Sequence, residues 1–255
     1  MKLATWNVNS IRARLPRVTA WLEGAKPDVV CLQETKVEDA DFPHEAFTSL
    51  GYTCAVFGQR SYNGVAIASR LPMADVSVGF DDGDADGEAR FICATVSGIR
   101  IASLYVPNGK AVGDPKFEYK LKWLSRLSAW LAKHQTPEAS FALCGDFNIA
   151  PDDRDVYDPV AWQDQVLCHP LERAAYQRLL EWGLQDVFRR FHQQGGLYSW
   201  WDYRQLGFPK NRGLRIDHLL CTRAVAERMR SAMVDREARK GKDPSDHAPV
   251  VVEIV

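Results

Sequence analysis

The stretch Phe141-Ala-Leu-Cys-Gly-Asp-Phe-Asn148 passes from a short apolar run directly into an aspartate and an asparagine. The run, residues 141–144, has the length and composition of a buried β-strand that stops at a glycine. Asp146 and Asn148 lie two positions apart, so an extended backbone would point both side chains to the same side. A buried strand with such an end is typical of an α/β protein that carries its polar site on the rim of a sheet.

Four further apolar runs end in the same kinds of side chain. Their ends read Trp6-Asn-Val-Asn9, Leu32-Gln-Glu-Thr-Lys36, Arg215-Ile-Asp217 and Ser245-Asp-His247. A single Asp or Asn after a strand is most often a turn residue or a helix cap, but five such ends in one chain indicate a shared site. Oxygen donors without thiols favour Mg²⁺ or Mn²⁺ over zinc. These donors are Asn7, Glu34, Asp146, Asn148 and Asp246.

The rest of the chain alternates short apolar runs with amphipathic stretches. A long helix is predicted after Asp114 as N-cap and Pro115 as first helical residue, and two more over residues 170–182 and 16–23. Strands outnumber helices, and short turns join several of them, so the sheets should be mixed or antiparallel. One domain over residues 1–255, built of two sheets covered by helices, is the simplest prediction. The other predicted strands are residues 2–8, 29–33, 53–57, 64–68, 91–96, 99–105, 198–201, 216–220 and 249–255.

The composition fits an ordinary globular protein, because 46% of the 255 residues are hydrophobic and 25% are charged. The formal net charge of −1 does not by itself indicate a nucleic-acid binder, so any DNA contact would need basic residues gathered on one face. Six cysteines without a Cys-x-x-Cys pair indicate reduced, buried thiols and a cytoplasmic protein. We find no signal-peptide segment and no apolar stretch as long as a membrane span.

Two segments match parts of other functional motifs. Residues 82–87, Asp-Gly-Asp-Ala-Asp-Gly, match the opening of a calcium-binding EF-hand loop, yet its twelfth position would be Cys93 rather than a bidentate glutamate. An acidic surface turn between strands is the better prediction. The segment Asn108-Gly-Lys110 lacks the preceding glycine and the following Ser or Thr of a phosphate-binding P-loop.

Between Trp6 and Val250 the chain carries motifs in the order WNVNS, LQETK, NGVAI, YVPN, GDFN, YSWWDYR, NRGLRID and PSDHAPV. This series resembles the exonuclease III group of abasic-site endonucleases in the endonuclease/exonuclease/phosphatase superfamily. The resemblance implies a four-layered α/β sandwich, in which two mixed β-sheets pack face to face and are flanked by helices. It also implies a DNA-repair enzyme that incises duplex DNA 5′ to abasic sites with Mg²⁺. The balance with 3′–5′ exonuclease and 3′-phosphatase activity stays open.

The resemblance assigns metal and water chemistry to matching residues. Glu34 corresponds to the principal ligand of Mg²⁺, for which Mn²⁺ could substitute, and Asn7 corresponds to an asparagine close to the metal. Asp146 corresponds to the group that activates the attacking water, and Asn148 to one that helps to orient it. Asp246 could hold a second metal ion, so the number of metals stays open.

Other matching residues contact the phosphate in the family. His247, held by the carboxylate of Asp217, corresponds to a phosphate-contacting histidine, and Tyr105 and Asn108 match further contacts on the phosphate side. A histidine fixed in this way can donate a hydrogen bond to a phosphoryl oxygen as charge builds there. An alternative scheme makes His247 the base in place of Asp146, and the sequence does not decide between them.

Substrate choice is expected to depend on the aromatic segment 198–208 and on basic residues near it. The positions of Trp200 and Leu214 match those that build an apolar pocket for a flipped abasic sugar in relatives. Basic residues are predicted to hold phosphates without reading sequence. They are Arg204, Lys210, Arg212 and Arg215, together with Arg12, Arg14 and Arg17. The predicted partner is double-stranded DNA with abasic sites or modified 3′ ends, bound by a monomer without membrane contact.

Two other functions stay open. A phosphatase of inositol phosphates or phospholipids would have a similar catalytic core, but the motifs WWDYR and NRGLRID favour DNA. A non-catalytic binding module on this scaffold would be expected to have replaced Glu34, Asp146 or His247, and all three residues are present.

Overall fold

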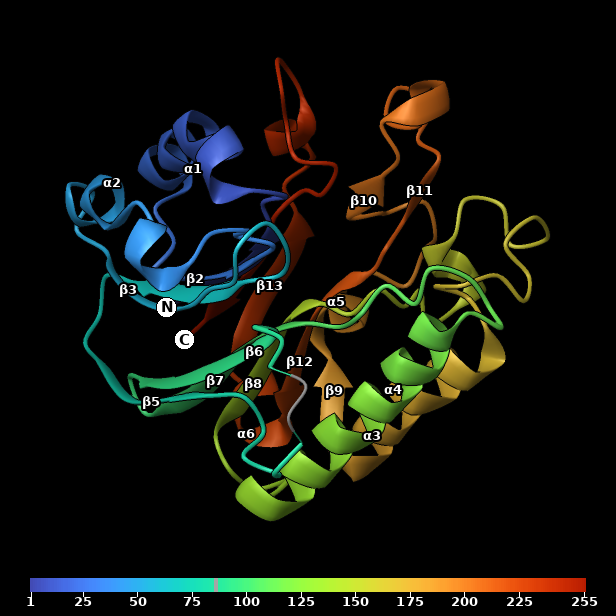
Figure 1. Cartoon of the computed structure of the whole chain (residues 1–255), viewed down its shortest axis with the longest axis horizontal. Helices are drawn as coiled ribbons and strands as arrows, with labels where there is room; N and C mark the ends of the chain where they lie inside the picture. Colours follow the sequence, from blue (N-terminus) through green and yellow to red (C-terminus); the bar gives the residue numbers. More distant parts are fainter. Residues whose placement is uncertain (85–86) are drawn as a thin grey trace.

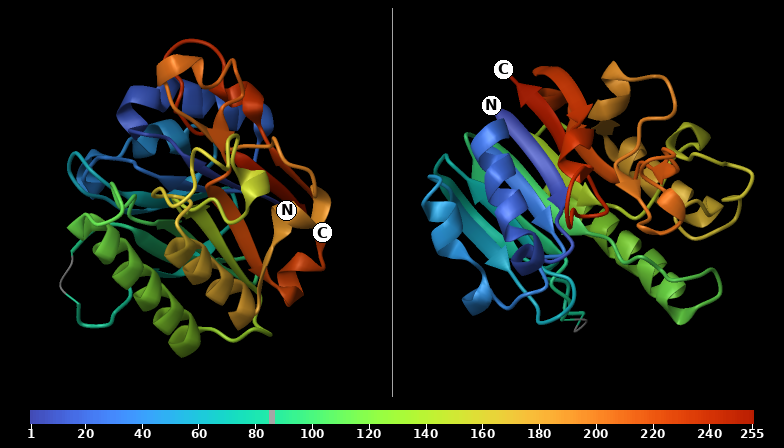
Figure 2. Two further views of the ribbon diagram at one scale, coloured as in Figure 1. Left: turned by 90° about the vertical axis from the view of Figure 1, so that its right-hand side faces the viewer. Right: turned by 90° about the horizontal axis from the view of Figure 1, so that it is seen from above.

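The computed structural model describes residues 1–84 and 87–255. Within these residues, two six-stranded β-sheets pack face to face (Figure 1, Figure 2). Helices α1 (Ile11–Ala25) and α2 (His44–Thr48) cover the outer face of one sheet, and helices α3 (Pro115–His134) and α4 (Pro170–Trp182) cover the outer face of the other. The predicted four-layered α/β sandwich is therefore confirmed.

Both sheets are mixed. In the first, β1 (Lys2–Asn7) runs parallel to β2 (Val29–Gln33), and in the second β7 (Ile99–Tyr105) runs parallel to β8 (Phe141–Asp146). The first sheet has the order β13 (Met229–Val234), β14 (Val250–Ile254), β1, β2, β4 (Val65–Ser69) and β3 (Thr53–Phe57). The second sheet has the order β5 (Met73–Val78), β6 (Phe91–Val96), β7, β8, β12 (Asp217–Thr222) and β9 (Leu184–Asp186).

Short elements complete the chain. They are the helices α5 (Val187–Phe191) and α6 (Arg223–Ala226), the strands β10 (Trp200–Trp201) and β11 (Gly213–Leu214), and the 3₁₀ turns η1 (Asp39–Asp41), η2 (Asp153–Asp155), η3 (Arg204–Leu206) and η4 (Arg236–Arg239). Strands β10 and β11 pair with each other outside the two large sheets. Their hairpin rises beside the yellow loop after β8 (Figure 1), where Val156 forms a β-bridge with Leu214.

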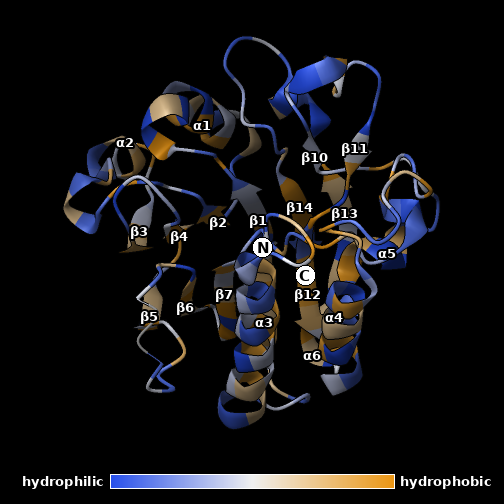
Figure 3. Ribbon diagram, turned by 45° about the vertical axis from the view of Figure 1, so that its right-hand side comes forward, coloured by the Kyte–Doolittle hydropathy of each residue, from blue (hydrophilic) through white to orange (hydrophobic). Residues whose placement is uncertain are grey.

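Strand β8 shows how the sequence produces this layering. Ala142 and Cys144 pack between the two sheets, whereas Phe141 and Leu143 pack against the outer helices. Successive side chains of a strand point to opposite faces, so a strand covered on both faces must be apolar throughout. The large side chains, Phe141 and Leu143, each stabilise the fold by about 1.5–3 kcal/mol through burial. Helices α3 and α4 accordingly turn their apolar sides inward (Figure 3).

Two of the three predicted helices begin where they were predicted to begin, and the third does not. Asp114 caps α3 by accepting a hydrogen bond from the backbone N–H of Lys116, and α4 covers the predicted residues 170–182. The prediction for 16–23 was wrong at its start, because α1 begins at Ile11 with Ser10 as its N-cap. Pro16 had suggested a first helical position, but it lies inside α1.

The sequence did not predict the edge strands β5, β13 and β9, nor the two-residue strand β11. Most side chains of β5 are exposed, and those of β13 are buried only at intervals. Edge strands bury one face at most, so they lack the continuous apolar run that identifies a central strand. The predicted strand 198–201 is reduced to the two residues of β10.

The acidic segment 82–87 and the cysteines match their predictions as far as the structure describes them. Ala85 and Asp86 lie outside the described residues, while Asp82 and Asp84 form ion pairs with basic side chains of α3. The six cysteines are free thiols, and five of them are buried. Among the described helices, none has both the length and the apolar character needed to cross a membrane.

Arg215 was predicted to hold DNA phosphates, and that prediction was wrong. Its side chain is only 1% exposed, and its guanidinium contacts Asp155 (Nε to Oδ1, 2.6 Å) and Asp186 (Nη2 to Oδ2, 2.7 Å). Although burial opposes it, the charge of Arg215 lowers the pKa of Asp186 to about 2. Arg215 therefore connects η2 to the far edge of the second sheet.

Replacing Arg215 by methionine should lower the free energy of unfolding by about 3–5 kcal/mol, because two buried carboxylates would lose their shared partner. Urea denaturation followed by tryptophan fluorescence measures this change. Arg204→Met is the matched control, since Arg204 pairs with Asp202 on an exposed loop and should have no measurable effect on stability. Equal effects of the two substitutions would contradict a stabilising role of the buried network.

Candidate active site

The strand topology brings the predicted polar residues to one rim of the sandwich. Because β1 and β2 are parallel, Asn7 and Glu34 emerge at the same end of the first sheet. In the second sheet Tyr105 pairs with Asp146, and Asp146 pairs with Asp217 where β12 begins. The predicted polar segments thus meet, but two of them were predicted to follow a strand and instead precede one: Asp217 begins β12, and His247 stands before β14.

Asn7 lies between the two carboxylates that the sequence singled out. Its Nδ2 donates to Glu34 Oε1 (2.8 Å) and to Asp146 Oδ2 (2.9 Å), so its amide joins the two sheets. The Asn7 side-chain oxygen accepts the backbone N–H of Asn9 and points away from both acids. Burial, together with the charges of Glu34 and Asp146, raises the pKa of Tyr105, so its hydroxyl stays protonated.

Asp146 is a buried carboxyl group. Burial, together with the charge of Asp217, raises the pKa of Asp146 to about 7 against the opposing effect of His247. The preceding Gly145 is required by a close approach of strands, because a Cβ there would lie 2.0 Å from the Leu104 carbonyl oxygen. An acid with its pKa near neutrality can accept a proton under physiological conditions.

Asn148 contacts Asp146, but not in the way that was predicted. Its φ of 49° places it in the left-handed region, so a turn rather than an extended strand brings the two residues together. Its backbone N–H donates to Asp146 Oδ1 (2.9 Å), and its Nδ2 donates to the Val106 carbonyl (3.0 Å). The Asn148 side-chain oxygen accepts from Asn108 Nδ2 at 3.0 Å.

His247 is fixed by a carboxylate on one side and faces Asp146 on the other. Its Nδ1 lies 2.9 Å from Asp217 Oδ2, and its Nε2 lies 3.8 Å from Asp146 Oδ2. Burial alone would lower the pKa of His247, but the charges of Asp217 and Asp146 raise it to about 10. The imidazole is therefore protonated at neutral pH, and Nε2–H can donate a hydrogen bond.

Backbone pairing holds this histidine next to the aromatic hairpin. Trp201 N–H donates to the Asp246 carbonyl (3.0 Å), and Ala248 N–H donates to the Ser199 carbonyl (2.8 Å). The Ser199 hydroxyl also accepts the backbone N–H groups of Ile216 and Asp217. The orientation of His247 therefore depends on residues far from it in sequence.

Glu34, Asp146 and His247 form the group that could hold a cation among the described residues, with one ligand atom from each within 4.8 Å of the others. The two carboxylates are hard oxygen donors, and a buried carboxyl with a raised pKa gains from a nearby positive charge. A hard divalent cation fits these residues. A protonated His247 would serve as a hydrogen-bond donor rather than as a ligand.

Asp246 lies apart from that group. Its carboxylate accepts from Asn9 Nδ2 (2.9 Å) and from Trp200 Nε1 (2.9 Å). Lys36 Nζ contacts both Glu34 Oε2 (2.7 Å) and Asn9 Oδ1 (2.6 Å). Sequence reasoning did not single out Asn9 or Lys36, although both stand inside the strand-end motifs that it used.

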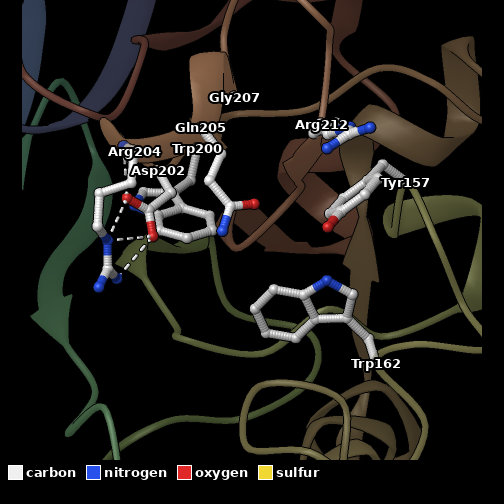
Figure 4. A pocket seen from close by; sticks show the side chains of 8 residues that line it. All are labelled: Tyr157, Trp162, Trp200, Asp202, Arg204, Gln205, Gly207 and Arg212. Carbon is white, nitrogen blue, oxygen red and sulfur yellow. Dashed lines mark hydrogen bonds and ion pairs between the residues drawn. The ribbon is translucent and has the colours of Figure 1, made fainter.

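A cleft of about 300 Å³ opens beside the site (Figure 4). Its walls come from the loop after β8 and from the β10–β11 hairpin. They are formed by Tyr157, Trp162, Trp200, Asp202, Arg204, Gln205, Gly207 and Arg212. Trp200 and Arg212 thus face a cavity as predicted. Leu214 does not, because it has no exposed surface and packs with Leu167 and Ile216 behind Trp200.

The other predicted basic cluster is largely occupied by contacts within the protein. Arg12 lies 3.0 Å from Asp41, and Arg14 donates to the hydroxyl of Tyr203 (3.1 Å). Arg17 donates to the backbone carbonyl of Lys242 at 2.8 Å. The prediction that these three arginines are free to hold phosphates was therefore wrong for Arg17, which ties α1 to the loop before β14.

Comparisons with known proteins show the family to which this chain belongs. The model of the endonuclease/exonuclease/phosphatase family matches residues 4–247. Exodeoxyribonuclease III of Haemophilus influenzae is 36% identical over 265 residues, which cover 99% of each chain. The structure of a 3′ phosphatase from Neisseria bound to a product DNA hairpin has a TM-score of 0.97 at 42% identity, and that of an AP endonuclease from Archaeoglobus fulgidus has 0.96 at 40%. Both of these structural matches cover 100% of this chain and 99% of the chain to which it is compared. The resemblance to the exonuclease III group is confirmed, and the chain belongs to the endonuclease/exonuclease/phosphatase family.

Proposed function

We propose that this protein is a Mg²⁺-dependent DNA-repair nuclease that cuts duplex DNA 5′ to abasic sites and processes modified 3′ ends. The observation that carries the proposal is the buried Asp146 carboxyl, which contacts Asn7 and Asn148 and faces the imidazole of His247. The relatives named above act as an exodeoxyribonuclease, an AP endonuclease and a DNA-bound 3′ phosphatase, and so support the choice of DNA.

Glu34, with Asn7 at its side, is proposed to hold the Mg²⁺ ion, for which Mn²⁺ can substitute. When bound, the metal supplies neutralisation of negative charge on the phosphate and on the departing 3′ oxygen. Asp246 is not assigned to this metal, because it lies outside the group of ligand atoms that Glu34, Asp146 and His247 form.

The chain's own groups are proposed to move the proton and hold the phosphate. Asp146 takes a proton from the attacking water, which Asn148 orients, and a pKa of about 7 suits that role. Protonated His247 donates from Nε2 to a phosphoryl oxygen, while Asp217 fixes the ring. The raised pKa of His247 favours this donor role over the alternative in which it is the base. Tyr105 and Asn108 make further phosphate contacts.

Substrate binding is proposed to involve the cleft lined by Trp200 and Arg212. Residues 1–255 would act as one catalytic unit and as a cytoplasmic monomer on double-stranded DNA. Contacts to phosphates rather than to base edges would make cleavage tolerant of sequence and sensitive to salt.

End-labelled duplexes test the proposal directly. One carries a single abasic site, one a recessed 3′-hydroxyl end and one a 3′-phosphate, and each is incubated with Mg²⁺ and then with EDTA. We expect metal-dependent processing, including incision 5′ to the abasic site, and complete loss of activity in EDTA. The absence of processing of every duplex at any Mg²⁺ or Mn²⁺ concentration would overturn the proposal. Phosphate release from inositol phosphates without DNA cleavage would identify the phosphatase alternative.

A further inference from the structure

Lys120, in the second turn of α3, is a charged side chain with no exposed surface. Its three ammonium hydrogens have three acceptors: the backbone carbonyls of Asn148 (2.6 Å) and Asn108 (3.2 Å), and Glu172 Oε1 on α4 (2.8 Å). A lysine is rarely buried completely unless all of its donors are satisfied. This ammonium group is therefore held in one place.

The two carbonyls belong to the two loops that carry the active-site asparagines. Asn108 follows β7, and Asn148 follows the neighbouring parallel strand β8. On the side facing the site, their side chains hydrogen-bond to each other at 3.0 Å. On the opposite side, one ammonium group binds both backbones. The relative position of the two amides thus depends on Lys120.

The backbone at Gly109 and Asn148 packs closely against Lys120. Gly109 has a φ of 91°, and a Cβ at this position would lie 3.1 Å from Lys120 Cδ. Asn148 adopts a left-handed conformation, with φ of 49°, that asparagine tolerates better than most residues. The Lys120 hydrogen bond to the Asn148 carbonyl supplies a contact that holds this conformation.

If the Lys120–Glu172 pair served only to stabilise the fold, removing it would leave kcat of the folded protein unchanged. A buried ion pair can often be replaced by two apolar side chains with no loss of stability. Such a replacement would keep the packing between α3 and α4 but would remove every hydrogen bond to the two loop carbonyls. Stability and positioning can therefore be separated by experiment.

We infer that Lys120 is a positioning residue for the reaction proposed above: it holds the Asn108 and Asn148 backbones so that both amides face the phosphate and the attacking water. The inference rests on the proposed function, because the asparagines matter only if a phosphate is hydrolysed there. Lys120 itself touches neither substrate nor metal.

The test compares the double variant Lys120→Met/Glu172→Met with Glu172→Gln. The double variant removes the charges together and should stay folded at the assay temperature, although its melting temperature falls because the two loop carbonyls lose their donor. Its kcat on the abasic-site duplex should fall by about 10- to 100-fold, while KM changes little. Glu172→Gln keeps an acceptor for Lys120, so it should retain kcat within about twofold. Should the first variant not fold, Lys120→Gln/Glu172→Gln makes the same comparison with a shorter side chain that has fewer donors.

The same substitutions in an Asn108→Ala/Asn148→Ala background show whether Lys120 acts through the asparagines. In that background, the loss caused by Lys120→Met/Glu172→Met should largely disappear. An unchanged loss there, or wild-type kcat in a folded double variant, would overturn this inference alone. Inactivity of the wild-type protein on every DNA substrate would instead overturn the proposed function, and this role with it.

Discussion

Replacing Asp146 by asparagine should lower kcat for cleavage of an abasic-site duplex by about 10²- to 10⁴-fold, the usual contribution of a positioned proton acceptor. Asparagine has nearly the same shape but only one acceptor oxygen, so it can keep one of the two hydrogen bonds that Asp146 accepts, from Asn7 Nδ2 or from the Asn148 backbone N–H. The fold and the affinity for DNA should therefore be preserved. Removing a carboxyl group that burial disfavours in its charged form should also not lower the melting temperature.

Single-turnover cleavage with saturating enzyme measures this loss, and fluorescence anisotropy with labelled duplex measures binding. Glu227→Gln is the matched control, because Glu227 is a carboxylate in an exposed pair with Arg223 on the far side of α6. That variant should cleave as the wild type does. Near-normal turnover by Asp146→Asn would remove this residue from the mechanism, whereas loss of binding and cleavage together would assign it a role in DNA affinity.

Replacing Asp217 by asparagine should shift the whole pH profile of kcat/KM toward acid. In the wild type with Mg²⁺ bound, activity should rise as Asp146 loses its proton, at or below about pH 7 because the charge of the metal favours the carboxylate, and should fall as His247 loses its proton near pH 10. Asp217 is the main charge that raises the pKa of His247, and it also raises the pKa of Asp146. Without that charge both pKa values fall, so both limbs of the profile move in the same direction.

The measurement compares initial rates between about pH 5.5 and about pH 9.5 at fixed ionic strength and saturating Mg²⁺. The variant should lose at least about tenfold at the alkaline end, where the wild type stays near its maximum, and should regain activity toward pH 6. A uniform loss at all pH values would show that Asp217 serves only to orient the ring. A profile with unchanged limbs would contradict His247 as the protonated donor.

The strand ends could be predicted from the sequence because their information is local. An apolar run followed by Asp, Asn, Glu or His describes one strand and its end, and parallel pairing of β1 with β2 and of β7 with β8 then brings these ends together. The start of α3 was predictable for the same reason, since Asp114 and Pro115 are adjacent. The contact between Asn148 and Asp146 was predicted, but its cause was not, because the spacing of two residues does not reveal a left-handed φ.

What could not be predicted depends on partners far away in sequence. Nothing near Arg215 indicates Asp155, which lies 60 residues earlier, or Asp186, which lies on another strand. A basic residue beside an aromatic segment therefore looked like a phosphate contact. Leu214 was misplaced similarly, because its burial depends on Leu167 from the loop after β8. Lys120 was not singled out, because the sequence alone does not distinguish it from the other polar positions of an amphipathic helix.

The ion pair between Arg215 and Asp155 stands between two parts of the molecule that have different roles. On one side of it lie the sheet ends, whose spacing is set by strand pairing. On the other side lies the loop that leads through Tyr157 and Trp162 to the cleft. Changes in that loop can alter which DNA end or lesion fits while the reactive groups keep their distances. Descendants of such a protein could acquire new substrates by exchanging one loop and inheriting the chemistry unchanged.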